Sequence, residues 1–135
     1  MPALDIIKLL WDAGKYAFEL AKGVQQKKEA DKKKVSDLFG YIGTLLHDTY
    51  VELDKGNYPY GHCRQIAVFG EKIKSDFKEQ LGEEEAKHLG DLLIVAHDVE
   101  SLQAQLGSGA VARERLHELE EASGEFIAAS KLIIF

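Results

Sequence analysis

Apolar residues recur at helical spacing along most of the chain, and strand-type alternation is nearly absent. The pattern predicts an all-α fold, an antiparallel bundle of four to five helices in a single domain over residues 1–135. The expected helices run from about residue 3 into a Lys-rich stretch, and then over 35–55, 62–81, 83–106 and 110–135. Turn-forming residues separate them at 55–61, 82 and 107–109.

The first expected helix is unusual because apolar side chains cover roughly 220° of its helical wheel. Its polar wedge is narrow and centres on Lys8, Asp12 and Lys15. Such a helix is either the central helix of the bundle or carries a second surface for a membrane or a partner. The candidate residues for that surface are Leu4, Ile6, Ile7, Leu10, Trp11 and Phe18.

The later helices each present one apolar face, which is expected to form the core. The predicted face of the second helix comprises Leu38, Tyr41, Ile42, Leu45, Leu46, Thr49, Tyr50 and Leu53. The last helix presents Leu116, Leu119, Ala122, Phe126, Ile127, Ile133 and Ile134. Gly40 and Gly43 lie three residues apart on one side of the second helix, where they would permit another helix to approach closely.

Composition narrows the class of protein. A single Cys allows neither a disulfide framework nor a thiolate zinc site within one chain. No apolar run approaches the roughly 18–20 residues of a membrane span. The net charge of −6 argues against a nucleic-acid partner. We therefore expect a cytoplasmic protein.

The charge is unevenly distributed. Residues 1–35 hold eight lysines and five acids, whereas the rest holds nine basic residues and eighteen acids. The basic cluster comprises Lys27, Lys28, Lys32, Lys33 and Lys34. It is either a solvated helix end or a site that attracts anionic headgroups and recruits the protein to a membrane surface.

We find no catalytic motif and expect no enzyme activity, cofactor or small-molecule substrate. Two Glu-x-x-His motifs, Glu85–His88 and Glu114–His117, leave a di-metal carboxylate protein as a remote alternative. They start successive helices, so antiparallel packing would separate them by roughly 30 Å, too far for one metal centre. Cys63 lies on an apolar stripe, where a free thiol is commonly buried and inert.

The segment between the second and third expected helices is the best candidate for surface recognition. Tyr58 and Tyr60 flank Pro59, which gives a stiff aromatic turn. Tyr is favoured at protein interfaces. The alternative is a turn whose tyrosines cover the end of the bundle.

A small helical bundle headed by a strongly apolar helix resembles the HeLo and Bell-type cell-death domains. The residues that carry the resemblance are Leu4, Ile6, Ile7, Leu10, Trp11 and Phe18, with the lysines behind them. The resemblance implies a non-enzymatic domain of a defence or signalling protein that oligomerises and acts on membranes through its N-terminal helix. The apolar ending at 131–135 fits the front module of a longer protein. The alternative function is a soluble adaptor or regulatory bundle that binds a protein partner.

Overall fold

The computed structural model describes residues 5–98, 104 and 109–135, with the backbone alone at 109–111, and the regular elements in these ranges are helical. This confirms the all-α prediction. The elements are α1 (Ile6–Val24), α2 (Glu29–Asp54), α3 (Tyr60–Asp76), the short α4 (Lys78–Leu81), α5 (Glu83–Ile94), the 3₁₀ turn η1 (Val95–His97) and α7 (Gly109–Ile134).

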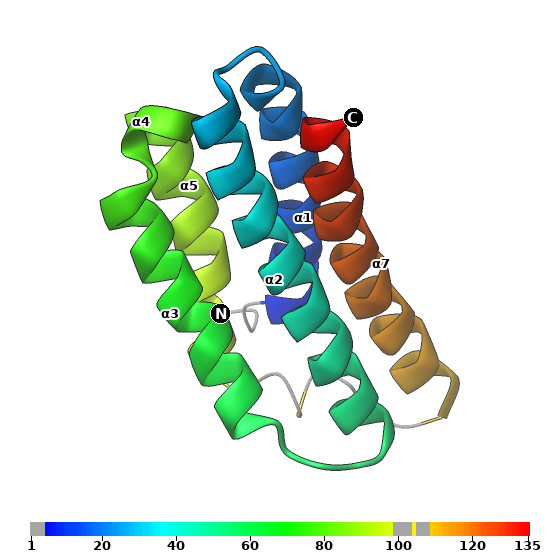
Figure 1. Cartoon of the computed structure of the whole chain (residues 1–135). Helices are drawn as coiled ribbons and strands as arrows, with labels where there is room; N and C mark the ends of the chain where they lie inside the picture. Colours follow the sequence, from blue (N-terminus) through cyan, green and yellow to red (C-terminus); the bar gives the residue numbers. More distant parts are fainter. Residues whose placement is uncertain (1–4, 99–103, 105–108) are drawn as a thin grey trace.

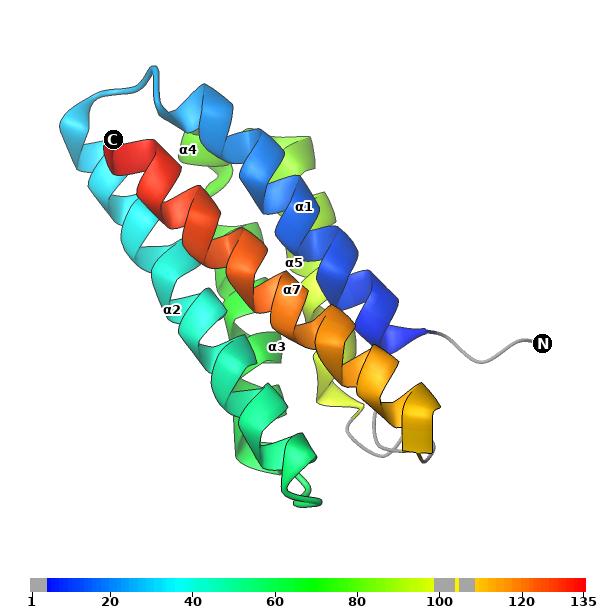
Figure 2. The same ribbon diagram turned by 90° about the vertical axis from the view of Figure 1, so that its right-hand side faces the viewer.

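The last helix packs between the first two (Figure 2). α7 runs antiparallel to α2, because Ser130 meets Ser36 near one end and Ser123 meets Gly43 further along. It runs parallel to α1, since Arg115 contacts Asp5 and Leu132 accepts a hydrogen bond from Gln25. α3 and α5 form an antiparallel pair on the other side of the bundle (Figure 1). The two helices nearest the chain ends, α1 and α7, therefore lie side by side.

Small residues bring α2 and α7 close together, as the spacing of Gly40 and Gly43 predicted. A Cβ at Gly43 would lie 2.6 Å from Ile127 Cγ1 and 3.1 Å from the Ser123 carbonyl oxygen. The Ser123 hydroxyl donates to the Gly43 carbonyl at 2.6 Å. Ser36 and Ser130 each donate to the other's carbonyl oxygen, at 2.9 and 2.7 Å. The seam thus combines backbone proximity with satisfied polar groups.

The α3–α5 pair crosses at two facing glycines. A Cβ at Gly70 would lie 2.6 Å from the Gly90 carbonyl oxygen, and one at Gly90 would lie 2.5 Å from that of Gly70. Backbone atoms cannot move aside as a flexible side chain can, so only glycine fits this crossing.

Three predicted boundaries are wrong. α2 begins at Glu29 rather than 35, because the charged run contains no breaker and its early acids suit a helix N-terminus. The helix expected over 62–81 breaks at Phe77, whose ring is buried while the Lys34 ammonium donates to the Asp76 carbonyl at 2.9 Å. α5 ends at Ile94 and not at 106. Most of the remaining predicted stretch, with the turn at 107–108, lies outside the described residues.

The predicted core faces are buried or half-buried, except for two exposed residues. Phe39 and Phe126 meet edge-to-face, 5.8 Å apart, where α2 and α7 enclose the core. Tyr41 is 66% exposed and Ile134 is 57% exposed, although both were placed on core faces. Tyr41 lies on the outer edge of α2 beside α3, where no element covers it in the described structure.

Candidate functional site

The apolar face of α1 belongs to the core. Ile6, Ile7 and Leu10 are each at most 1% exposed. α7 packs against one side of the helix and α5 against another (Figure 2). This arrangement matches the central-helix interpretation, and in this conformation these three residues are inaccessible to a partner or a membrane. Leu4 lies outside the described residues.

The outward side of α1 carries an aromatic and basic stripe. Trp11 and Phe18 are half-buried, and the Lys15 ammonium lies 4.4 Å from the Trp11 ring centroid. The Lys22 ammonium lies 5.7 Å from the Phe18 ring. Each lysine stands over the face of a ring, where the ring's quadrupole attracts a cation. Of the predicted α1 surface, only these two aromatic residues are accessible among those the structure describes.

The basic cluster is divided between paired and unpaired lysines. Lys32 pairs with Glu29 at 3.4 Å and Lys33 with Asp37 at 3.0 Å. Lys34 caps the end of α3 and stands 4.6 Å from the Phe77 ring. Lys27 and Lys28 lie exposed in the turn between α1 and α2, and neither forms an ion pair with the described residues. Three of the five lysines therefore have structural partners.

The predicted aromatic turn between α2 and α3 exposes both of its tyrosines. We call Tyr58, Pro59 and Tyr60 the tyrosine loop. The two Tyr rings stack with centroids 5.8 Å apart and planes 12° apart, and each residue is 54% exposed. Pro59 between them is buried. Asn57 donates to the Glu52 carboxylate at 2.8 Å, which fixes the approach to the loop.

The α2–α3 face also holds a groove that sequence reasoning missed. It encloses about 620 Å³. Its apolar lining comes from Leu38, Tyr41, Phe69 and Phe77, and its charged rim from Lys34, Asp37, Lys72 and Asp76. The rim charges largely neutralise one another, because Lys72 and Asp76 pair at 3.5 Å and Asp37 is bound by Lys33. The sequence signal that could have indicated the groove was Tyr41, which helical periodicity assigned to the core.

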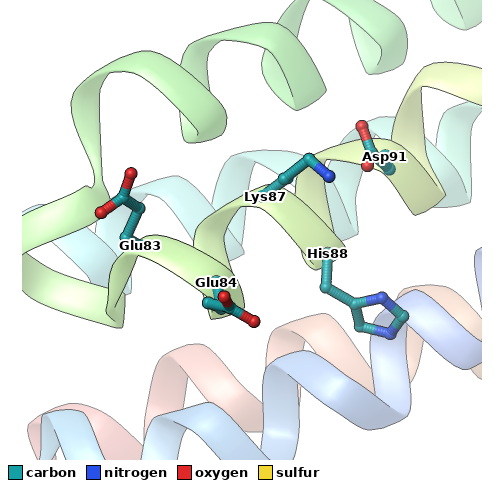
Figure 3. Close-up of a pocket in the computed structure, with 5 residues that line it drawn as sticks. All are labelled: Glu83, Glu84, Lys87, His88 and Asp91. Carbon is teal, nitrogen blue, oxygen red and sulfur yellow. The ribbon is translucent and has the colours of Figure 1, made fainter.

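A polar pocket of about 470 Å³ lies along α5 (Figure 3). Its lining side chains are spread over different sides of the helix, with His88 directed towards α1 and Glu83 and Lys87 away from it (Figure 3). The His88 ring meets the Tyr16 ring edge-on at 4.7 Å. The pKa of Tyr16 is raised mainly by partial burial and to a smaller extent by the negative charge of Glu85. This arrangement does not converge on a point where a substrate atom could react.

The two Glu-x-x-His motifs lie far apart. His88 contacts Tyr16, whereas Arg115, next to Glu114, contacts Asp5 at 2.6 Å. Eleven residues of α1 separate these contacts, or about 16 Å along the helix axis. His117 pairs with Glu121 at 3.3 Å. Across the part of the chain that the structure describes, no three His, Cys, Asp or Glu residues are placed to hold a metal ion.

Cys63 lies in the core on the inner side of α3. It is fully buried, and this desolvation raises the pKa of its thiol to about 12. The thiolate is the nucleophilic form, so the buried side chain is unreactive at neutral pH.

Comparisons with known proteins identify no relative: no protein-family model, curated protein or solved structure matches the chain. Within the described ranges, no helix has the length and apolar content needed to cross a membrane.

Proposed function

We propose that this chain is a non-enzymatic helical domain that binds a protein partner through the tyrosine loop. The observation that carries the proposal is the pair of stacked, half-exposed rings of Tyr58 and Tyr60 on a buried Pro59. Large side chains held in fixed positions lose little conformational entropy on binding. Tyr is also enriched among the residues that dominate binding energy at interfaces.

The groove between α2 and α3 supports the same assignment. Tyr41 lines this groove. Val68, which precedes the groove residue Phe69 on α3, is 48% exposed. Four of the six exposed large apolar side chains among the described residues therefore lie on the α2–α3 hairpin. A partner that contacts the tyrosine loop could extend along this hairpin.

The test is affinity capture with the wild-type chain and matched tyrosine variants. The double change Tyr58→Ala and Tyr60→Ala is expected to abolish retention of the partner, because each lost anchor costs about 2 kcal/mol or more. Ile134→Ala is the control, since it removes a large apolar side chain of similar exposure, 57%, that lies outside the hairpin. A partner retained equally by the loop variant and the wild type would contradict the proposal.

A second candidate function is the membrane-acting effector of a defence or signalling protein. It is favoured by the outward stripe of α1, where Lys15 and Lys22 flank the accessible rings of Trp11 and Phe18. Amphipathic helices that bind the membrane interface combine aromatic and basic residues in this way. The candidate ranks second because inserting the apolar face would require α1 to leave the core. Exposing Ile6, Ile7 and Leu10 alone would cost about 1.5–3 kcal/mol each, against a total domain stability of about 5–15 kcal/mol.

Leakage from vesicles containing anionic lipid tests this candidate. The expected result is release of an entrapped dye by the wild type and weaker release by the double variant Trp11→Ser and Phe18→Ser. Leu10→Lys would be a poor probe, because Leu10 is fully buried and the change would unfold the domain. Absence of leakage at all protein-to-lipid ratios would eliminate the candidate.

A further inference from the structure

The solvent-facing side of α7 forms one continuous stripe. It comprises six exposed residues at alternating spacings of four and three: His117, Glu121, Gly124, Ala128, Lys131 and Phe135. We call this stripe the outer face of α7. It faces away from the core, between α1 and α2 (Figure 2).

The outer face of α7 is complementary to itself about its midpoint at Phe126. Gly124 and Ala128 each lie two residues from Phe126, and Glu121 and Lys131 each lie five residues away. His117 and Phe135 each lie nine residues away. If a second copy of the helix runs antiparallel with its midpoint opposite the first, small residues meet small residues and each Glu121 meets a Lys131.

The charges around the stripe have the same symmetry. Residues 113–125 of α7 hold five acids and two arginines, whereas residues 126–135 hold one lysine and no acid. The turn with the exposed Lys27 and Lys28 lies beside this basic half, because the Gln25 amide donates to the Leu132 carbonyl oxygen. A surface with one basic and one acidic half is complementary to a second copy turned by a two-fold rotation.

We infer that the outer face of α7 joins two copies of this chain in an antiparallel, two-fold symmetric dimer. Gly124 and Ala128 allow close approach at the axis: a Cβ built at Gly124 would have no atom within 4 Å. Beside them, a hollow of about 680 Å³ lined by Phe18 leaves room for side chains of the second copy. Lys131 forms no ion pair with the described residues, so it is available to the Glu121 of the other copy.

The contact is expected to be weak. Glu121 already pairs with His117 of its own helix at 3.3 Å, so the new ion pair must compete with it. Exposed ion pairs contribute little in water and are screened by salt. One helix face also buries less than the area of a standard stable interface. Dimerisation should therefore require high protein concentration and should weaken as salt is added.

Sedimentation equilibrium of the full chain, from about 10 μM to about 1 mM at low salt, tests the proposal. The wild type should shift from a 15.0 kDa monomer towards a species of twice that mass. The two-fold dimer has two contacts between Glu121 and Lys131. In a dimer of either single variant, Lys131→Glu or Glu121→Lys, both contacts join like charges. Each variant alone should weaken dimerisation at least about tenfold.

Mixing the two variants provides the decisive arm, because a Lys131→Glu chain and a Glu121→Lys chain are complementary to each other. The mixture should dimerise, and so should the chain that carries both changes. Lys87→Glu on α5 is the control for an equal change in charge outside the face. The double change Tyr58→Ala and Tyr60→Ala should leave the dimer intact, which separates this proposal from partner binding by the tyrosine loop.

Three results would overturn the proposal. The first is a wild type that stays monomeric at about 1 mM. The second is a dimer that both charge reversals leave unchanged. The third is a mass that grows beyond the dimer with concentration, because an open assembly would exclude a closed two-fold contact. Gly124→Trp should also block the dimer while the circular dichroism spectrum stays helical, since the site has space for a side chain.

Discussion

The first helix buries three large apolar side chains near its N-terminus, whereas the α2–α3 hairpin leaves four exposed along its outer edge. In α1, Ile6, Ile7 and Leu10 are at most 1% exposed. On the hairpin, Tyr41, Tyr58, Tyr60 and Val68 are between 48% and 66% exposed. The cause is the number of neighbours: α1 packs against helices on more than one side, whereas the outer edge of the hairpin has none in the described structure. A recognition surface thus depends on which neighbours are missing and not on apolar content.

A charge introduced into each region should give the largest difference. Leu10→Lys should destabilise the domain by about 4 kcal/mol or more, because it removes a fully buried side chain and leaves an ammonium without a partner. Val68→Lys on the hairpin should change stability by less than about 0.5 kcal/mol. Urea unfolding followed by circular dichroism measures both. Similar midpoints for the two variants would remove the distinction between the regions.

The next largest difference in stability is expected between substitutions on the two sides of α3. Gly70→Val should cost about 2–4 kcal/mol, because the new Cβ would lie 2.6 Å from the Gly90 carbonyl and the helices would have to separate. Gly61→Val on the same helix should be tolerated within about 0.5 kcal/mol, since no atom lies within 4 Å of its Cβ position. The comparison uses thermal unfolding of both variants. An undisturbed Gly70→Val protein would show that the crossing is looser than described.

Alkaline pH should reveal the burial of Cys63. Burial raises the pKa of this thiol from 9.0 to about 12, so the folded state holds its proton at pH values where the unfolded chain loses it. The corresponding stability is fully present below pH 9 and is lost as the pH rises towards about 12. The Cys63→Ala variant should lose less stability over this range, as measured by urea unfolding at each pH. Rapid reaction of native Cys63 with a thiol reagent at neutral pH would contradict its burial.

The smallest effect is expected on the outer face of α7. Gly124→Ala should stabilise the domain by about 0.5–1 kcal/mol, because Ala has the higher helix propensity and its Cβ meets nothing. Gly43→Ala, on the packed seam with α7, should have the opposite sign. Its Cβ would lie 2.6 Å from Ile127. Thermal unfolding of the pair in dilute solution, where the chain is monomeric, compares an open helix face with a packed one. A destabilised Gly124→Ala protein would contradict the open space at Gly124.

Periodicity was sufficient to predict the helices and most of the core, because core residues such as Ile42 and Leu46 of α2 repeat at helical spacing. The close approach at Gly43 was also predictable, although the serines that complete the seam were not. The break at Phe77 was missed because it depends on Lys34, which is distant in sequence and supplies the hydrogen bond that ends α3. The position of α7 between α1 and α2 depends on long-range packing, which a local pattern does not contain.

The candidate site was only partly predictable. The tyrosine loop followed from Tyr58, Pro59 and Tyr60 alone, because turn chemistry is local. The groove was missed because Tyr41 shares the angular position of core residues, and its exposure depends on how α3 packs against α2, which a local pattern does not contain. The surface expected on α1 was predicted from apolar content, which does not distinguish a buried face from a free one. The action of α1 on membranes, which would require it to leave the core, stays a prediction.

Native-state hydrogen exchange of the α1 amides, with and without vesicles of anionic lipid, tests the central claim most directly. If α1 is an integral core helix, its slowest amides should exchange with the free energy of global unfolding, matching those of α3 and α7. The vesicles should leave that value unchanged. Opening of α1 at a clearly lower free energy than the other helices, or loss of its protection on addition of vesicles, would contradict the account.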